Sequence, residues 1–560
     1  MLALELYKYL GLSNNMFKNI LYPLLRKNKR GFFVIFFFSI LVSLGGAIQP
    51  FIMQHIIDNA ILASNINQLF YLVLISFFLA IFVMLMSAVN EIYYTKNSMN
   101  ILFEFRKIVF NRLFLHNKTF LNKYHSADLM SRVQGDISEL QRFYTDSIFS
   151  LFSTIISLVF ISCIIYSYNI KLMILILIFL PIEFICLKPL YPHMQNSTKT
   201  MRESTSNIGK FFIENFRYML TIKNLGAKEQ VIDKLDFIQD DYKNVVIKNK
   251  KINLLFSQIP AFISLLGKTI IIAYGGYLTI KGELKIGELV AFLTYFTMIL
   301  APVHTILGVI NNFPKVKVSL NRVLEILPKE KDNIELKTTN FDLEIKNLEF
   351  FYSNNKIFEN LNLFIKERSK IAIIGKNGAG KTTFADLLCG FVKANNGDIF
   401  IGNQKIGKND YINFSSYLVK LEQSPIIFDD TLKNNLLLAK NNASEEELID
   451  SLKKTGMFEW FKKLEKGLNT NILESGANLS GGQKQRLALS RLILLNPKII
   501  ILDEFTSSID EKDSIWFYEN ISIIFPNSTI IAITHNLNML SYFEKVYLLE
   551  DKTLKEYKNV

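Results

Sequence analysis

The segment from Gly375 to Thr383, Gly-Lys-Asn-Gly-Ala-Gly-Lys-Thr-Thr, combines residue types that bind phosphate. It follows the apolar run from Ile371 to Ile374 and precedes a helix-like sequence, so the order strand, glycine loop, helix is expected. Glycines let successive backbone N–H groups turn toward one anion, and the start of the helix adds positive partial charge. Lys381 has the spacing to reach the β- and γ-phosphates of ATP, and the Thr382 hydroxyl the spacing to coordinate Mg²⁺. The ATP-binding residues predicted in this loop are Gly375, Asn377, Gly378, Gly380, Lys381, Thr382 and Thr383.

Two adjacent carboxylates follow a second apolar strand. The run from Ile499 to Leu502 leads into Asp503 and Glu504. Because side chains alternate along a strand, the two carboxylates are expected to point in different directions. Asp503 is then placed to hold magnesium through water, and Glu504 to address the water that attacks the phosphate.

A second glycine-containing helix start lies between these motifs. Ser480, Gly481, Gly482 and Gln483 open a helix-like stretch and predict a second anion site. Tyr352 ends the first strand of the same region, where its ring could stack on a flat base. A core tyrosine at the end of a strand would have the same local sequence.

The composition indicates a membrane protein. Half of the 560 residues are hydrophobic, with 47 Phe, and the apolar residues gather in the first three-fifths of the chain. The net charge of +13 comes from basic residues that lie mainly between apolar segments, which argues against nucleic acid as a partner. The three cysteines have neither metal-ligand nor disulfide spacing.

Six apolar stretches are long enough to cross a bilayer as helices. They run from 31 to 57, 69 to 89, 147 to 168, 172 to 190, 254 to 280 and 289 to 310. The segments between them on one side carry almost no positive charge, which predicts a multi-pass protein of the cytoplasmic membrane with both termini in the cytoplasm.

The two long polar loops, 94–141 and 192–251, are longer than a simple connection requires. We expect the membrane helices to continue into the cytoplasm and to end in short elements that contact another domain. Phe120–Ser131 and Phe212–Leu220 are the candidate contacts, and solvated helical hairpins are the alternative.

The predicted domains are a cytoplasmic segment (1–30), a transmembrane domain of six helices (31–328), a linker (329–340) and a nucleotide-binding domain (341–560). The predicted fold class is therefore an all-α transmembrane domain with long intracellular helical extensions, followed by an α/β P-loop ATPase domain with a helical subdomain.

In this order the motifs resemble those of ATP-binding cassette (ABC) exporters of the half-transporter type. The resemblance covers nearly the whole chain and includes GKNGAGKTT, LSGGQ, the IIILDE strand, Gln423 in KLEQSP, Asp510 in SSID and His535 in AITHN. Glu474 matches the exporters' X-loop, and KYHSADLMSRV and TIKNLGAKE are similar to exporter-specific stretches of the membrane domain. Phe505, in place of the usual small residue, and the SSID sequence depart from the family pattern without removing a catalytic group.

The resemblance implies a head-to-tail dimer, formed with a second copy or with a related half-transporter. Lys381 of one cassette would then face Ser480 and Gly482 of the other across ATP. Gln423 would sense magnesium and the γ-phosphate, His535 would hold the γ-phosphate, and Asp510 would connect the two sites. ATP binding would close the dimer and switch the membrane domain from inward- to outward-facing.

The expected function is ATP-driven export of a peptide, a lipid-linked species or an amphipathic molecule. An ATP-gated channel or a signalling protein on the same scaffold is the alternative, which the intact Glu504 and signature sequence disfavour. Since no peptidase-sized segment precedes Gly31, cleavage of leader peptides is not expected.

Charged residues inside the apolar spans are candidates for a substrate cavity. Glu183 lies 12 residues from Lys171, and Lys268 lies 13 residues before Lys281. Both therefore sit about 18–20 Å below the outer surface, a depth at which ionisable groups are expensive unless they are paired or face water. They would either form a salt bridge with each other or bind cargo, and His304 is the third candidate of this cavity.

Overall fold

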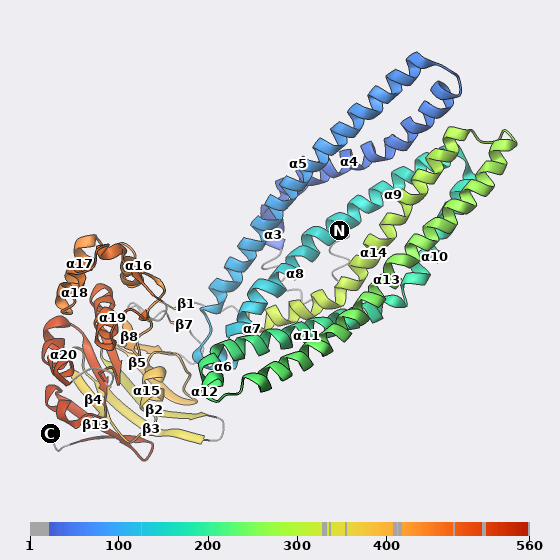
Figure 1. The fold of residues 1–560 in the computed structure, drawn as a ribbon. Coiled ribbons are helices and arrows are strands. Elements are labelled where there is room, and N and C mark those ends of the chain that lie inside the picture. Colours follow the sequence, from blue (N-terminus) through green and yellow to red (C-terminus); the bar gives the residue numbers. More distant parts are fainter. Residues whose placement is uncertain are drawn as a thin grey trace. The chain divides into compact units, whose positions relative to one another are not determined.

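A computed structural model describes residues 22–124, 126–327, 333–334, 338–352, 355–406, 411–412, 417–473, 476–506 and 511–557. It divides into two compact units. Unit 1 contains residues 22–112 and 126–327, and unit 2 contains residues 113–124 together with the described residues from 333 onward. The predicted fold class is confirmed, because unit 1 consists of helices, among them six long apolar segments, and an α/β domain makes up most of unit 2 (Figure 1).

Six helical segments of unit 1 are long and apolar enough to cross a membrane. They are Lys29–Ile61 (α4 Lys29–His55 and η2 Ile56–Ile61), α5 (Ile66–Leu113), Asp128–Tyr168 (within which lies α9, Ile148–Tyr168), α10 (Ile170–Leu187), α13 (Lys228–Ile280) and α14 (Ile286–Glu325). Asn169 separates α9 from α10: its extended backbone ends one helix, and its side chain accepts hydrogen bonds from the N–H groups of Lys171 and Leu172 at the start of the next.

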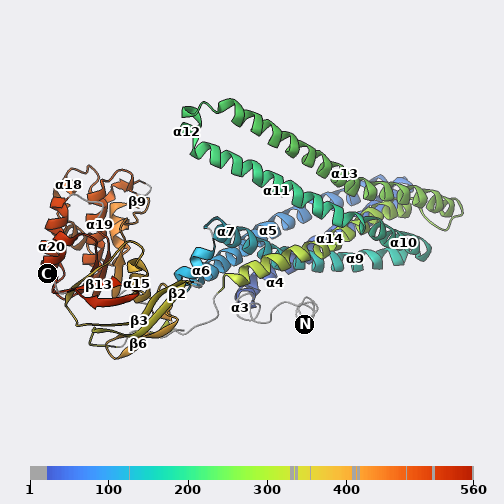
Figure 2. The same cartoon turned by 90° about the horizontal axis from the view of Figure 1, so that it is seen from below.

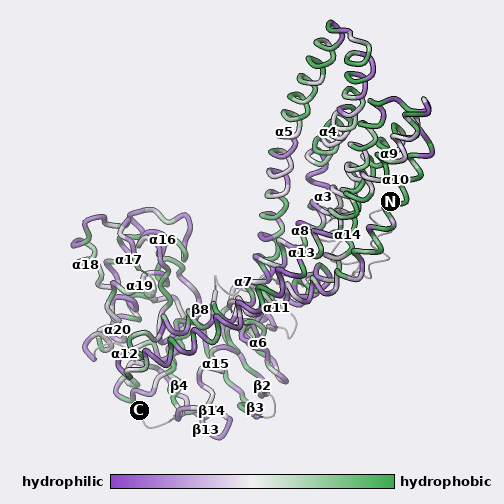
Figure 3. The backbone as a smooth tube through the Cα atoms, turned by 45° about the vertical axis from the view of Figure 1, so that its right-hand side comes forward, coloured by the Kyte–Doolittle hydropathy of each residue, from purple (hydrophilic) through white to green (hydrophobic). Residues whose placement is uncertain are grey.

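The helices extend well past their apolar parts, as expected from the long polar loops. The 53 residues of α13 correspond to about 80 Å of helix, far more than the roughly 30 Å of hydrocarbon in a bilayer. α13 pairs with the polar helix α11 (Leu190–Arg217) through α12 (Met219–Asn224), as Figure 2 shows. In Figure 3, α11 and the neighbouring part of α13 are largely hydrophilic, whereas α4 and the N-terminal half of α5 are largely hydrophobic.

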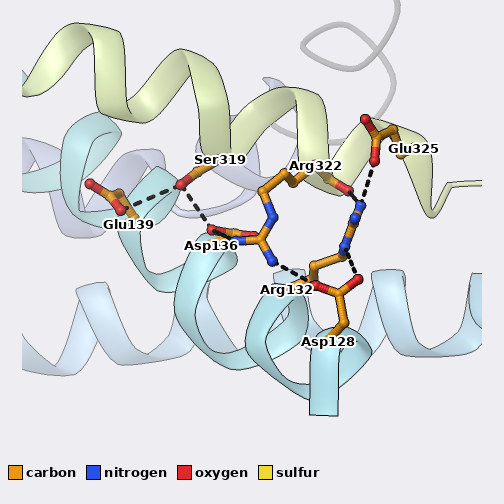
Figure 4. A network of polar contacts seen from close by, with 7 residues as sticks. All are labelled: Asp128, Arg132, Asp136, Glu139, Ser319, Arg322 and Glu325. Carbon is orange, nitrogen blue, oxygen red and sulfur yellow. Dashed lines mark hydrogen bonds and ion pairs between the residues drawn. The ribbon is translucent and has the colours of Figure 1, made fainter. Parts of the chain in front are cut away.

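Short helical segments form the remainder of unit 1. They are α3 (Tyr22–Lys27), α7 (Ser126–Ser131), η3 (Arg132–Asp136), α8 (Ile137–Arg142) and η4 (Phe143–Ser147). An ion network connects α7 and η3 to the end of α14 (Figure 4). Arg322 contacts Asp128 at 2.8 Å and Asp136 at 3.1 Å, and Arg132 contacts Asp128 at 2.9 Å and Glu325 at 2.8 Å.

Unit 2 is built on a six-stranded sheet in the order β14-β13-β4-β12-β11-β8. β8 (Leu418–Leu421), β11 (Ile499–Asp503), β12 (Thr529–Ile533), β4 (Lys370–Ile374) and β13 (Lys545–Glu550) are parallel, and β14 (Thr553–Glu556) is antiparallel. All five residues of β11 are buried, as expected for a central strand covered on both faces.

A four-stranded antiparallel sheet and a helical subdomain complete unit 2. The sheet consists of β3 (Asn355–Ile365), β2 (Leu343–Tyr352), β5 (Asn396–Ile401) and β6 (Gln404–Ile406), in that order. The helical elements are α6 (Lys118–Lys123), α15 (Lys381–Leu388), α16 (Leu432–Leu437), α17 (Glu445–Lys454), α18 (Phe458–Lys462), η6 (Gly467–Asn469), α19 (Gly481–Leu495), α20 (Glu511–Ile524) and η8 (Leu537–Tyr542). The short pairs are β1 (Asn333–Ile334) with β7 (Tyr411–Ile412) and β9 (Asp430–Thr431) with β10 (Asn471–Ile472).

Candidate active site

The glycine loop lies between β4 and α15, as the sequence predicts. Gly378 and Gly380 have φ angles of +83° and +102°, values that side chains disfavour. A Cβ atom on Gly380 would also lie 2.7 Å from the Ile357 Cγ2 atom. The loop conformation therefore requires glycine at 380, directly before the first turn of α15.

Lys381 is buried, and its ammonium group points back into the loop. Its Nζ donates to the carbonyl oxygens of Gly375 at 2.9 Å and Lys376 at 3.3 Å. The same nitrogen lies 3.7 Å from Glu504 Oε1. A cation held by a loop of this shape is placed to neutralise phosphate oxygens that enter the loop.

The two carboxylates lie at the carboxyl end of β11 and contact different groups. Asp503 Oδ1 accepts from the Thr382 hydroxyl at 3.5 Å. Glu504 has a φ angle of +50°, and its N–H donates to the Ile533 carbonyl of β12 at 2.9 Å. His535 Nδ1 lies 3.8 Å from Glu504 Oε1. Glu504 thus faces Lys381 and His535, whereas Asp503 faces Thr382.

The oxygens at Thr382 and Asp503 suit magnesium. Mg²⁺ prefers oxygen ligands from one or two protein groups together with substrate phosphates, and these two oxygens adjoin the phosphate loop. Gln423 lies near the same edge of the sheet. Leu421 of β8 pairs with Leu502 of β11, and Gln423 follows two residues after Leu421. Its side chain is exposed.

The second glycine motif forms the start of α19. Ser480 caps this helix: its hydroxyl accepts from the Gln483 N–H at 3.2 Å, and Gln483 Oε1 accepts from the Ser480 N–H at 2.9 Å. This reciprocal capping box fixes the first turn, which contains Gly481 and Gly482. Ser480 and Gly481 are exposed, so this helix start lies at the surface of the described chain, where helix N-termini can bind anions.

Tyr352 ends β2 with 45% of its surface exposed, and its ring packs edge-on against Phe350 at 4.8 Å. It is therefore not a fully buried core tyrosine. Asp510 and Glu474 lie outside the described residues.

Sequence reasoning missed two charged residues next to this site. Lys420 of β8 lies between Asp386 of α15 and Asp503, at 2.9 Å from a carboxylate oxygen of each. Burial by itself lowers the pKa of Lys420, but hydrogen bonds and charge from the two aspartates outweigh burial and raise the pKa above its ordinary value. A lysine inside the apolar strand Leu418–Leu421 was the available signal.

The segment around α6 also contacts the α/β part of unit 2. Lys118 Nζ lies 2.7 Å from Asp386 Oδ2, and the Lys118 N–H donates to the Phe391 carbonyl at 2.8 Å. These contacts begin two residues before the predicted stretch Phe120–Ser131. Phe212–Leu220 belongs to unit 1.

The proposed salt bridge between Glu183 and Lys268 is not formed. Glu183 of α10 is fully buried within unit 1. Lys268 of α13 is partly exposed and makes no ion pair with any residue that the structure describes. The two residues lie on different helices, and the depth in the membrane that is derived from the sequence does not determine which faces of two helices meet. For His304, in α14, the side chain lies outside the described part of the chain.

Comparisons with known proteins agree with this architecture. Residues 32–303 match the family described as ABC transporter transmembrane region, and residues 358–507 match the family described as ABC transporter. An export ATP-binding/permease protein of Rickettsia typhi is 26% identical over 541 residues, which cover 94% of this chain and 93% of the relative. A multidrug export ATP-binding/permease protein of Staphylococcus aureus is 24% identical over 471 residues, which cover 82% and 81%. The structure of a bacterial Atm1-family ABC exporter with ATP bound has a TM-score of 0.80 at 20% identity and covers 95% of each chain.

The two matched regions lie in one chain, in the order membrane domain and then ATP-binding domain. The chain therefore belongs to the ABC transporter family, and its fused domains make it an exporter-type half-transporter.

Proposed function

We propose that the chain works as a homodimer that couples ATP hydrolysis to export of a substrate across the cytoplasmic membrane. One observation carries the proposal: Lys381, Thr382, Asp503, Glu504 and His535 converge within hydrogen-bond or ion-pair distance at the glycine loop. A chain that only bound nucleotide would not need the carboxylate of Glu504 opposite the phosphate-binding lysine.

Each group has a distinct task in the proposed reaction. Lys381 neutralises the phosphate oxygens, and Thr382 with Asp503 holds the metal site. Magnesium, when bound, neutralises charge on the β- and γ-phosphates. Glu504 accepts a hydrogen bond from the attacking water and orients it for in-line attack. His535, next to Glu504, contacts the γ-phosphate, and Gln423 reports on metal and phosphate from the end of β8.

The capped start of α19 supplies the second half of each site. Its exposed first turn is a phosphate-binding surface, so the Ser480 surface of one copy would close over ATP held by the Lys381 loop of the other. Asp510 would connect the two sites. Closure would switch the membrane helices from inward- to outward-facing, and hydrolysis would reset them.

The substrate is proposed to be a peptide, a lipid-linked species or an amphipathic molecule. The multidrug name of the Staphylococcus aureus relative adds support to the amphipathic class. Glu183, Lys268 and His304 remain candidate substrate-cavity residues. Because Glu183 is fully buried, cargo would reach it only after the helices around it separate.

Inside-out vesicles that contain the purified full chain test this proposal. Accumulation of a probe from one of the three classes, dependent on ATP and absent in a Glu504→Gln variant, is the expected result. Glu544→Gln, an exposed substitution of the same kind, is the matched control and should transport normally. Single-channel currents without accumulation against a gradient would contradict an exporter and support an ATP-gated channel.

A further inference from the structure

We propose that Lys420 is a positioning residue that connects the magnesium-site carboxylate Asp503 to the intracellular segment α6 through Asp386. The inference rests on the proposed ATPase function, since it concerns the same metal site. It goes further by assigning a path of ion pairs through which metal binding at that site would affect α6. In the sequence, α6 lies between two of the membrane-spanning segments.

Four charged groups alternate in sign along this path, all of them within unit 2. Lys118 Nζ lies 2.7 Å from Asp386 Oδ2, and Lys420 Nζ lies 2.9 Å from Asp386 Oδ1 and 2.9 Å from Asp503 Oδ2. Each aspartate contacts its two neighbours through different oxygens. Asp386 contacts Lys118 through Oδ2 and Lys420 through Oδ1. Asp503 contacts Lys420 through Oδ2 and the Thr382 hydroxyl through Oδ1. The path thus runs from α6 to the metal site through three direct ion pairs.

Burial makes the middle of the path sensitive to displacement. The side chains of Lys420, Asp386 and Asp503 are 2%, 3% and 9% exposed. In an interior with few solvent dipoles, a charge that loses its neighbour is strongly destabilised. A shift of Asp503 toward a bound cation therefore changes the position of Lys420, and a shift of Lys420 changes how Asp386 holds Lys118.

The α6 end of the path is anchored twice on the same turn. In addition to the ion pair, the Lys118 N–H donates to the Phe391 carbonyl at 2.8 Å. The Phe391 N–H in turn donates to the Asp386 carbonyl at 2.9 Å. Asn117 caps α6 by accepting from the Phe120 N–H at 2.9 Å, which holds Lys118 in the first turn. A shift of Asp386 would therefore affect the backbone of α6 as well as the Lys118 side chain.

Thermodynamic reciprocity gives the expected behaviour. If cation binding at Asp503 changes how firmly α6 is seated, the seating of α6 changes cation affinity by the same factor. A salt bridge that only stabilises the fold would show no such dependence, because α6 would then be equally protected with and without metal.

Amide hydrogen exchange of residues 113–124 in the full-length protein measures this coupling without hydrolysis or transport. The Glu504→Gln background is used, and MgATP is compared with ATP plus a chelator, so that only the metal differs. The expected result is a change of about fivefold or more in the exchange rate of this segment. Lys118→Met should abolish that change, whereas Lys123→Met on the same helix, whose ammonium lies over the Tyr124 ring, should preserve it.

A second variant guards against misfolding, since Lys420→Met alone leaves the buried Asp503 without its cation and Asp386 with Lys118 as its remaining partner. Lys420→Met with Asp386→Asn removes one charge of each sign and should fold. The double variant should abolish the metal-dependent change in hydrogen exchange. It should also weaken Mn²⁺ binding in the presence of ATP, as measured by electron paramagnetic resonance. The control removes the exposed pair Lys405–Asp398, at 2.7 Å, in the same way.

Two results would overturn the proposal: no metal-dependent change in the parent protein, or an undiminished change in the folded double variant. Failure of the proposed export function is a separate outcome, because it would appear in the vesicle assay and leave these exchange and metal-binding readouts intact.

Discussion

Glu504 occupies an unusual backbone conformation for its residue type. A glutamate with a φ angle of +50° is disfavoured by about 1–2 kcal/mol, and such strain persists only where surrounding contacts maintain it. Its N–H is bonded to Ile533 of the neighbouring strand, which fixes the turn after β11. The turn directs the carboxylate toward Lys381 and His535 instead of along the strand.

The first prediction concerns this carboxylate. Glu504→Gln keeps the side-chain shape but removes the carboxylate that is proposed to orient the attacking water, so ATP should still bind while hydrolysis slows by about 10²–10⁴-fold. Single-turnover hydrolysis and nucleotide binding, measured on the same sample, check the two parts. Substantial residual turnover would mean that another group orients the water.

The second prediction concerns Cys389 at the end of α15. Burial raises the pKa of its thiol to about 12, so the thiol should remain protonated, and therefore unreactive, at pH 8. Iodoacetamide labelling followed by peptide mass spectrometry should show almost no modification of Cys389 in the folded protein. In denaturant its pKa returns to the ordinary value, and labelling should become complete. Rapid labelling of the folded protein at pH 8 would contradict the burial.

At the scale of elements, a buried central strand and a helix cap position the residues of the candidate site. β11 delivers Asp503 and Glu504 from a strand whose residues are all buried, and the capping box fixes the start of α19. In unit 1, the network of Figure 4 connects α7 and η3 to the end of α14. Removing Arg322 would leave the mostly buried Asp136 with less compensating charge, which such sites tolerate poorly.

The third prediction tests β11. Ile501 is fully buried, so Ile501→Ala should lower the free energy of unfolding of unit 2 by about 2–5 kcal/mol through lost contacts and a cavity. Both tryptophans of the chain, Trp460 and Trp516, lie in unit 2, so urea unfolding followed by tryptophan fluorescence reports on this unit. Ile523→Ala, at a site 76% exposed, is the control and should change little. An equal effect of both substitutions would show that β11 is not the core strand.

At the scale of the whole molecule, the proposed sites need two copies. The Lys381 loop and the Ser480 surface are separate parts of one chain, each suited to one side of a nucleotide. A shared site makes the two halves genetically separable, because each ATP would be held by groups from different copies.

The fourth prediction uses that separation. In the proposed dimer, Lys381→Ala should weaken phosphate binding within its own cassette, and Ser480→Arg should block closure over ATP held by the partner. A mixed dimer therefore has one site with both lesions and one with neither, so a 1:1 mixture should recover ATPase activity that each variant lacks alone. Tandem affinity purification with two tags isolates the mixed dimers for the assay. Complete inactivity of isolated mixed dimers would argue against shared sites or show that both sites must work.

The sequence by itself determined the features that depend on local geometry or on length. The glycine loop is recognisable because its residues are contiguous and bind phosphate through their own backbone. The six spans follow from the thickness of hydrocarbon, and the order of the motifs predicted an α/β domain after a helical one. These predictions needed no information on which distant residues meet.

Only the tertiary structure decided the charge pairings, because these depend on which faces of separate elements come together. Lys118, Asp386, Lys420 and Asp503 come from four distant segments and meet through the parallel order of β8 and β11 and the contact of α6. The same dependence explains why Glu183 and Lys268 do not form the salt bridge that was one of their two expected roles, since equal depth in a membrane does not make two side chains face each other. Lys420 in an apolar strand was visible in the sequence, but its role required its two aspartate neighbours.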